Sequence, residues 1–149
     1  MQWQLKKYKE LTVDEFHNIL QLRINVFVVE QNCPYPELDG KDKMAYHFFA
    51  FTEEKPKQIL AYTRIFKPGD YYKKAAIGRV VVHPDFRNKK LGYQLIIKSI
   101  QQVKKLFNTS AIKIGAQTYL KKFYESHGFI KIGEEYLEDG IPHIYMVKK

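Results

Sequence analysis

Apolar positions recur with a helical period in three parts of the chain. In the first, Thr12 and Glu15 fit an N-terminal capping box, and the apolar residues that follow predict a helix over 13–27. The second is the clearest, with apolar residues at offsets of four, seven and eleven across 96–107. The third predicts a short helix over 119–127, which a glycine ends.

Other apolar runs are shorter, and each either alternates with polar residues or is continuous, as expected of β-strands. The run over 75–82 ends in consecutive valines, which predicts a strand buried on both faces. Strands alternate with helices in the middle of the chain, whereas both ends are typical of antiparallel pairing. The predicted fold class is therefore mixed α/β, a mixed sheet covered by helices. The predicted strands cover 3–8, 47–52, 58–66, 75–82, 111–116, 129–136 and 143–148.

Composition and charge limit the class of protein. The chain has 149 residues, a formal charge of +9 and 45% hydrophobic residues, which fits one globular domain over 1–149. The charge allows a nucleic acid, an anionic membrane or an anionic ligand as partner. The single cysteine, Cys33, excludes an internal disulfide. With no signal segment and no long apolar run, we expect a cytoplasmic protein that makes no membrane contact.

A basic junction separates the strand over 75–82 from the clearest helix. It reads VVVHPDFRNKKLG over 80–92 and carries Arg87, Lys89 and Lys90 at a helix start. Unpaired N–H groups and the positive end of the helix dipole attract an anion there, and phosphate is the expected guest. The alternative is that these cations are ordinary solvated surface, although the helix dipole disfavours them at this end.

The same segment resembles the acetyl-coenzyme A binding segment of the GNAT N-acetyltransferases, in which Q/R-x-x-G-x-G/A follows a strand. Here the motif reads RNKKLG over 87–92, with Lys90 in place of the first glycine. A Cβ at that position disfavours positive φ, so we expect a looser loop than usual. A second segment, TYLKKFYESHGF over 118–129, resembles the helix beside the pantetheine arm. Further similarity over 22–42 and 138–146 is typical of the ElaA-like branch.

The resemblance implies the GNAT acyltransferase fold, a twisted and mostly antiparallel mixed sheet with helices on both faces. It also implies a splay between the fourth and fifth strands, here 75–82 and 111–116, where a peptide N–H of Val80 or Val82 polarises the thioester oxygen. The implied co-substrate is acetyl-coenzyme A. The residues expected to bind it are Val80, Val81, Val82, Arg87, Asn88, Lys89, Lys90, Leu91, Gly92, Tyr93, Gln117 and Tyr124.

The implied reaction is direct attack of a primary amine on the thioester through a tetrahedral intermediate. Tyr124 is the expected general acid for the leaving thiolate, because a phenol stays protonated at neutral pH. A general base is harder to assign, since the strand over 75–82 has no carboxylate. We expect His47 in this role, unless it is only a strand-end histidine bonded to backbone. The other candidates are Glu30, Glu37, Asp39, Asp42 and His143.

Acceptor recognition is predicted in the proline-containing loop after the first helix. Glu37, Asp39 and Asp42 concentrate negative charge there, which suits a cationic amine, and His143 is expected to join them. The same carboxylates also fit ordinary turn positions. No spacing of Asp, His or Cys matches a metal-site signature, so no metal is expected, and Cys33 is expected to be a small buried residue.

Two other classes of function fit parts of the sequence. One is an acetyl-coenzyme A sensor or interaction protein that binds without turnover. The other is a basic nucleic-acid-binding module, although the cations are spread over the chain and no RRM, KH or helix-turn-helix signature occurs. The acetyltransferase hypothesis predicts a small-molecule or peptide amine as acceptor and no nucleic-acid partner. It also allows a homodimer formed through an edge strand.

Overall fold

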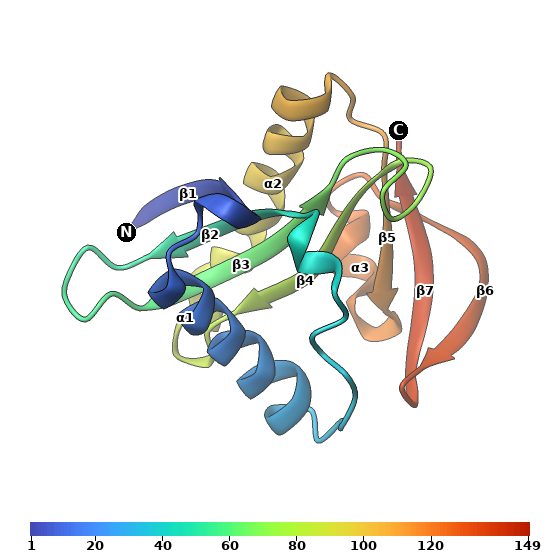
Figure 1. The fold of residues 1–149 in the computed structure, drawn as a ribbon. Helices are drawn as coiled ribbons and strands as arrows, with labels where there is room; N and C mark the ends of the chain where they lie inside the picture. The colour runs from blue at the N-terminus through green and yellow to red at the C-terminus, as the bar shows by residue number, and fades with distance from the viewer.

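The computed structural model describes residues 1–149 except for the side chain of Asn88, and within them a seven-stranded sheet runs in the order β1-β2-β3-β4-β5-β7-β6 (Figure 1). Neighbouring strands are antiparallel apart from the parallel pair β4 and β5, so the predicted mixed, mostly antiparallel sheet is confirmed. The strands are β1 Gln2–Lys7, β2 Tyr46–Phe51, β3 Ile59–Phe66, β4 Ala75–Val82, β5 Ile112–Gln117, β6 Ile130–Glu138 and β7 Ile141–Lys148.

Helices cover both faces of the sheet (Figure 1). α1 (Val13–Ile24) packs on one face, and α2 (Leu91–Phe107) and α3 (Lys121–Glu125) pack on the other. The predicted capping box forms at the start of α1, because Thr12 Oγ1 accepts the Glu15 N–H at 3.0 Å and the Glu15 carboxylate accepts the Thr12 N–H at 2.8 Å. Among the residues that the structure describes, none of the helices is both long and apolar enough to cross a membrane.

The helix predicted over 13–27 changes its winding near its end. α1 ends at Ile24 and continues as a π-helical segment, η2 (Asn25–Glu30). Within this segment Val26 is buried in the core, Phe27 packs against the same core cluster, and both line a cavity near the middle of the sheet. π-helical turns are frequent at functional sites, because the wider turn changes the direction in which side chains project.

The sheet divides the core into two layers. Along β2, Phe48 and Ala50 pack toward α2, whereas Phe49 and Phe51 pack toward α1. All eight residues of β3 are buried, which explains why this strand has no exposed polar face. The inner strands are therefore held by apolar contacts on both sides, and they form a rigid frame for the site.

β4 and β5 separate after a short contact. They pair only at Ala75 with Ile112 and Ala76 with Lys113. Beyond this point β4 stays with β3, and β5 pairs with β7 along its whole length. A bulge accompanies the separation, because the register places two residues of β4, Arg79 and Val80, opposite one residue of β3. Bulges bend a strand and change its twist, so the splay predicted between the fourth and fifth strands is present.

Candidate functional site

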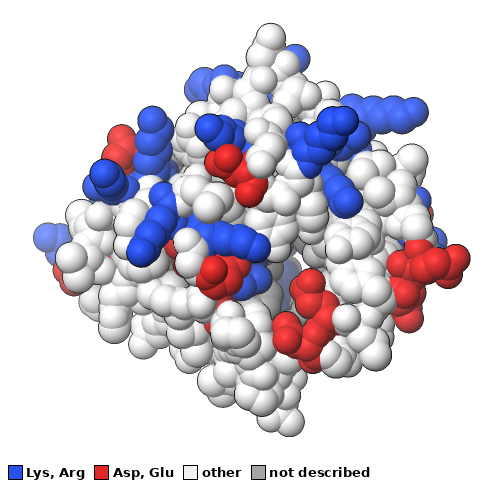
Figure 2. Space-filling view, turned by 45° about the vertical axis from the view of Figure 1, so that its right-hand side comes forward, with Lys and Arg blue, Asp and Glu red and all other residues white. Residues whose placement is uncertain are grey.

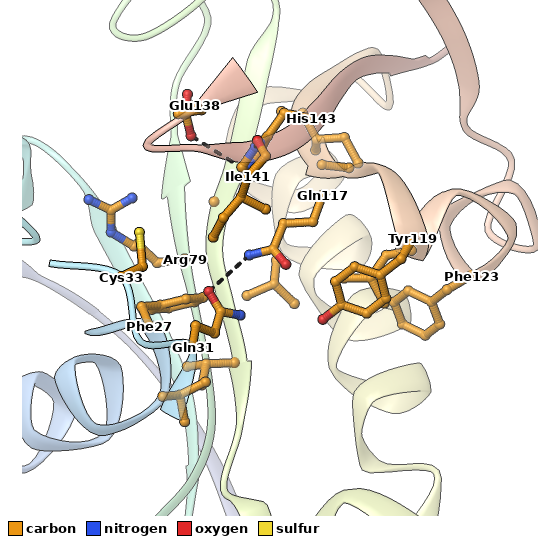
Figure 3. A pocket seen from close by; sticks show the side chains of 18 of the residues that line it. Phe27, Gln31, Cys33, Arg79, Gln117, Tyr119, Phe123, Glu138, Ile141 and His143 are labelled. Carbon is orange, nitrogen blue, oxygen red and sulfur yellow. Dashed lines mark hydrogen bonds and ion pairs between the residues drawn. The ribbon is translucent and has the colours of Figure 1, made fainter. Parts of the chain in front are cut away.

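A cavity of about 470 Å³ occupies the gap between β4 and β5 (Figure 3). Residues 77–82 of β4 form one wall and residues 114–117 of β5 form the other. Phe27 contributes from the face covered by α1, and Phe123 and Tyr124 contribute from the face covered by α2 and α3. Since the lining side chains come from both faces, the cavity passes through the sheet at the splay.

The edge of β4 that faces the cavity carries backbone groups that β5 does not pair. His83 donates its N–H to the Leu60 carbonyl on β3 at 2.8 Å. The side chains from Val80 to Val82 alternate between the two core layers, so this stretch is extended. N–H directions alternate in the same way, and the N–H groups of Val82 and Val80 therefore point away from β3 into the gap.

The basic junction forms the 3₁₀ segment η4 (Pro84–Lys89) and leads directly into α2. Lys90 adopts a left-handed backbone with φ of +56°, the conformation that glycine occupies most easily. We expected a lysine at this position to make the loop looser, but the loop keeps the backbone conformation that a glycine would adopt. The left-handed backbone costs this residue roughly 1–2 kcal/mol. None of the described side chains caps α2, which leaves its first N–H groups available to a ligand.

Arg87 is held at the rim of the cavity by an acidic partner. Its Nη1 and Nη2 donate to the two carboxylate oxygens of Glu30, each at 2.6 Å, and its Nε donates to the Val82 carbonyl at 3.3 Å. The arginine and the glutamate both line the cavity. The pair therefore joins the loop before α2 to the segment after α1, and Arg87 is oriented before any ligand arrives.

The structure brings part of the predicted coenzyme-binding set to the cavity. Leu91 is instead buried in the core, and Tyr93 packs against His127 with a ring separation of 4.4 Å. Lys89 and Lys90 are exposed, and the side chain of Asn88 lies outside the described part of the chain. The predicted residues that line the cavity are Val80, Val81, Val82, Arg87, Gly92, Gln117 and Tyr124.

Tyr124 projects from α3 into the cavity wall and is only 5% exposed. Its ring contacts Phe123 and Phe129 edge to face, at centroid distances of 5.1 and 6.0 Å. None of the described residues hydrogen-bonds its hydroxyl. Burial, and to a smaller extent the nearby Tyr119, raise the pKa of Tyr124 above its ordinary value. The hydroxyl is therefore protonated at neutral pH and can donate a proton.

His143 lies across the cavity from the segment that follows α1. Its Nδ1 is 2.7 Å from the Ile141 carbonyl oxygen, and its Nε2 is 3.5 Å from a Glu138 carboxylate oxygen. Beside it, Gln117 Nε2 donates to Gln31 Oε1 at 3.2 Å across the cavity (Figure 3). His143 and Gln117 are thus the two predicted site residues that meet at the β5–β7 end of the cavity.

Several cavity residues were not predicted from the sequence. The turn between β6 and β7 was interpreted only as a hairpin, although its acidic residues reach the cavity. Gln31 belongs to a segment that was interpreted only as an irregular loop. A helical wheel over 13–27 would have placed Phe27 on the core face. These residues are Phe27, Gln31, Tyr35, Arg79, Tyr119, Glu138 and Asp139.

His47 is not in the cavity, so the prediction that made it the base is corrected. The side chain is fully buried between β2 and its neighbours. Its Nδ1 lies 2.6 Å from the Tyr62 hydroxyl, and its Nε2 lies 2.9 Å from the Asp42 carbonyl oxygen. Burial lowers its pKa. The ring therefore serves the core, which is the alternative stated for a histidine at a strand end.

The predicted acceptor-binding carboxylates are also not in the cavity, and this assignment is corrected too. Asp42 accepts from Arg23 at 2.7 Å and from Arg64 at 3.1 Å. Glu37 accepts from Arg23 at 3.0 and 2.9 Å, and Asp39 accepts from Arg64 at 2.9 and 2.8 Å. Each carboxylate already has a cationic partner. With Arg79 these residues form one ionic network of Arg23, Glu37, Asp39, Asp42, Arg64 and Arg79.

Arg79 connects the ionic network to the bulge. It has a left-handed backbone with φ of +49°, which is strained for a residue with a side chain. Its Nε lies 2.6 Å from Glu37 Oε2, and its Nη2 donates to the Glu37 carbonyl at 3.0 Å. These contacts hold the strained residue in place, and the position of the next residue, Val80, depends on them.

The charge around the cavity differs from that of the protein as a whole. Figure 2 shows a hollow with acidic side chains beside it, while basic side chains gather above. Of the acidic lining residues, Glu30 is paired with Arg87. Glu138 and Asp139 have no arginine or lysine partner among the described residues. They leave negative charge at one rim of the cavity in a protein of net charge +9. This negative rim favours a cationic ligand.

Comparisons with known proteins show similarity that extends over nearly the whole chain. The family model for the acetyltransferase (GNAT) domain matches residues 5–149. Protein ElaA of Escherichia coli is 40% identical over 151 residues, which cover 100% of this chain and 97% of that protein, and its crystal structure has a TM-score of 0.89. An acyl-CoA N-acyltransferase from Pseudomonas aeruginosa has a TM-score of 0.92 at 38% identity, over 100% of both chains.

A more distant structure shares the fold alone. It is an aminoglycoside 6'-N-acetyltransferase complexed with coenzyme A, 12% identical, with a TM-score of 0.69 over 97% of this chain and 96% of that one. The predicted fold, with helices on both faces of a mixed sheet and a splay beside β4, is therefore confirmed by two close structures and found again in a remote one.

We expect Asp42→Asn to destabilise the protein strongly. The substitution removes one negative charge between two buried arginines, and breaking a buried ion pair costs about 3–5 kcal/mol. Chemical denaturation at pH 7 measures the loss in the free energy of unfolding. Asp85→Asn is the matched control, because the Asp85 carboxylate is 81% exposed and its only ionic contact among the described side chains is with His83 Nδ1, at 3.9 Å. Equal effects of the two variants would contradict a structural role for the network.

The difference between wild type and Asp42→Asn is expected to depend on pH. Burial alone would raise the pKa of Asp42, but the hydrogen bonds and charge of Arg23, together with Arg64, outweigh it and lower that pKa. A folded-state pKa below the unfolded value of about 3.9 means that the carboxylate stabilises the fold above that pH. The stability difference is then lost as pH falls below about 4. A difference that grows in acid would contradict this assignment.

Proposed function

Because the chain belongs to the acetyltransferase (GNAT) domain family and to its ElaA-like branch, as its motifs predicted, we propose that it transfers an acetyl group from acetyl-coenzyme A to a primary amine. The observation that carries the proposal is the splay, which puts free N–H groups of β4 and the hydroxyl of Tyr124 into one cavity. Residues 1–149 are taken as one acyltransferase domain.

The residues of the cavity fit a coenzyme A thioester. An extended pantetheine arm contains amides, and the unpaired edge of β4 offers it the hydrogen bonds that β5 does not make. The pyrophosphate would lie at the uncapped start of α2, near Lys90 and Arg87. Gly92 lies at this start of α2, where a Cβ would make ordinary contact with Val82 at 3.6 Å and only a larger side chain would crowd the cavity wall. The distant acetyltransferase of the same fold was crystallised with coenzyme A, which supports coenzyme A as the ligand class.

The chemistry follows from where each group points. An N–H of Val80 or Val82 would stabilise the oxygen that becomes negative when the amine attacks the thioester carbon. When the C–S bond breaks, the sulfur leaves as a thiolate, and the Tyr124 hydroxyl can donate a proton to it. The tyrosine regains a proton from the amide nitrogen. Transfer is direct, so Cys33 in the cavity wall is not needed as a nucleophile.

The first test is calorimetric titration of the purified protein with acetyl-coenzyme A. Saturable binding is expected, because the unpaired N–H groups of β4 and α2 match the ligand. Dephospho-coenzyme A and a nonspecific oligonucleotide are the controls, and weaker binding of the former would locate a cationic contact to the 3′-phosphate. Oligonucleotide binding in place of acetyl-coenzyme A would overturn the proposal. Binding without turnover of any amine would favour a sensor.

Gly92→Val is expected to weaken binding of acetyl-coenzyme A. The added branches would crowd the cavity wall between Val82 and Phe123, and a penalty of about 1–3 kcal/mol corresponds to roughly 5- to 140-fold in the dissociation constant. Gly92→Ala is the matched control, because its Cβ would make ordinary contacts at 3.6 and 4.0 Å. If both variants bind like the wild type, the pyrophosphate is held elsewhere.

Tyr124→Phe is expected to slow turnover without changing the affinity for acetyl-coenzyme A. The variant keeps the ring that packs between Phe123 and Phe129 and removes only the hydroxyl. Loss of a general acid lowers kcat by about 10²-fold or more. Steady-state kinetics and the calorimetric dissociation constant measure the two effects separately. An unaltered kcat would exclude Tyr124 as the acid.

A further inference from the structure

His143 faces the cavity from β7, and its two ring nitrogens have different partners. Nδ1 lies 2.7 Å from the Ile141 carbonyl oxygen, which can only accept a hydrogen bond. Nδ1 must therefore carry the hydrogen, and in the neutral ring Nε2 then has a free lone pair. The ring is 7% exposed and lines the cavity, so the lone pair is held in a fixed place.

The charged groups closest to Nε2 are carboxylates. The nearest charged atom is a Glu138 carboxylate oxygen at 3.5 Å, too long for a good hydrogen bond but within ion-pair distance when the ring carries a second proton. Tyr136 lies beside the ring at a centroid distance of 5.8 Å. Asp139, in the same hairpin turn, adds a second negative charge to this rim of the cavity. No described arginine or lysine is paired with either carboxylate to offset this effect.

Apart from Glu138 and Asp139, whose carboxylates are left to hold the cationic amine, the other candidate proton acceptors are engaged or protonated. Glu30 is bound by Arg87 through both of its oxygens. Burial raises the pKa of Tyr35 to about 12, so its hydroxyl is protonated at neutral pH and cannot act as a base. The carboxylates of the ionic network and His47 lie outside the cavity, and each is hydrogen-bonded. Among the described residues, His143 thus offers the best-placed free lone pair.

We propose that His143 is the general base that deprotonates the acceptor amine, with Glu138 as its positioning residue, an inference that rests on the proposed function. A base is needed, because an alkyl amine with a pKa of about 10.4 is free of its proton in only roughly one molecule in 2,500 at pH 7. The acidic rim formed by Glu138 and Asp139 attracts the ammonium form, and Nε2 of His143 then removes one proton.

The proton balance is complete without any further reactant. One N–H bond of the ammonium breaks, and its proton forms the imidazolium of His143. The nitrogen lone pair forms the new C–N bond, and the C–S bond breaks as the carbonyl re-forms. Tyr124 gives its proton to the sulfur and regains one from the amide nitrogen. His143 then releases its proton to solvent, so each turnover gives one amide, one thiol and one proton.

The test is the pH profile of kcat/KM for wild type and His143→Asn, using acetyl-coenzyme A and the best amine from a panel. Asparagine keeps a donor near the Nδ1 position and so preserves the hydrogen bond to Ile141, but it has no basic nitrogen. The expected loss is about 10²-fold or more at pH 7. The difference in kcat/KM between wild type and this variant should become smaller as pH rises, because the amine then loses its proton unaided. His17→Asn, at an exposed site on α1, is the matched control and should behave like wild type.

Two further variants keep the test decisive if asparagine disturbs the fold. His143→Ala should recover activity when imidazole is added, which a purely structural role would not allow. Glu138→Gln should lower kcat with little change in the KM for acetyl-coenzyme A, because the ring loses the carboxylate that orients it and pairs with the imidazolium formed during transfer. The calorimetric dissociation constant for acetyl-coenzyme A should stay unchanged in all of these variants.

The outcomes separate the two proposals. If wild type turns over an amine and His143→Asn gives the same pH profile, the role of His143 is overturned and the proposed function stands. A lack of imidazole rescue together with an unchanged kcat in Glu138→Gln leads to the same conclusion. If wild type acetylates no amine in the panel, the proposed function and the role of His143 fall together. Loss of activity with rescue by imidazole supports both.

Discussion

The separation of β4 from β5 is the constraint on which the rest of the structure depends. Backbone N–H and C=O groups inside a sheet are normally paired, and leaving them unpaired is costly. Here pairing stops after two residue pairs, and the edge that remains borders a cavity in the middle of the protein. The fold tolerates this edge because β3 and β7 hold the two strands on their outer sides. A bound molecule can then take the hydrogen bonds that a strand would otherwise make.

The ionic network explains how a strained strand keeps its shape. Charged side chains are expensive to bury, and well-packed apolar residues would often be at least as stable. The network instead joins the loop before β2 to the bulge on β4 through Arg79 and Glu37. Apolar contacts are not directional and could not fix a left-handed residue in this way. The charges therefore define the geometry of one peptide group more than they add to stability.

Much of this fold could be predicted from local patterns, and the bounds of β4 were predicted to the residue. The capping box, the order of elements and the motif over 87–92 each depend on residues close in sequence. The ion pairs that the carboxylates of the loop before β2 form could not be predicted in this way. Glu37 pairs with Arg23 and Arg79, which are 14 and 42 residues away, and only the folded sheet brings them together. The same holds for His47, whose partner Tyr62 lies on the next strand.

Residues of the cavity were likewise predictable where they belong to a local motif, and were missed where only packing brings them to the cavity. Tyr124 and Gly92, which both line the cavity, were predicted because each belongs to a short motif with its own spacing. Gln31 and Glu138 have no motif, and they reach the cavity only because η2 and the β6–β7 turn are packed beside the splay. Lys90 is a different case, since a rule about glycine was applied correctly but the surrounding turn outweighed it.

A cavity that passes through the sheet also affects the order of events. A site with one entrance makes two reactants compete for it, and the first product must leave before the second substrate can enter. The start of α2 and the β6–β7 turn both contribute to the cavity lining, so in the proposed reaction a donor held at the first and an acceptor held at the second would occupy different parts of it. Both would then be bound at the same time, and the rate would depend on a ternary complex.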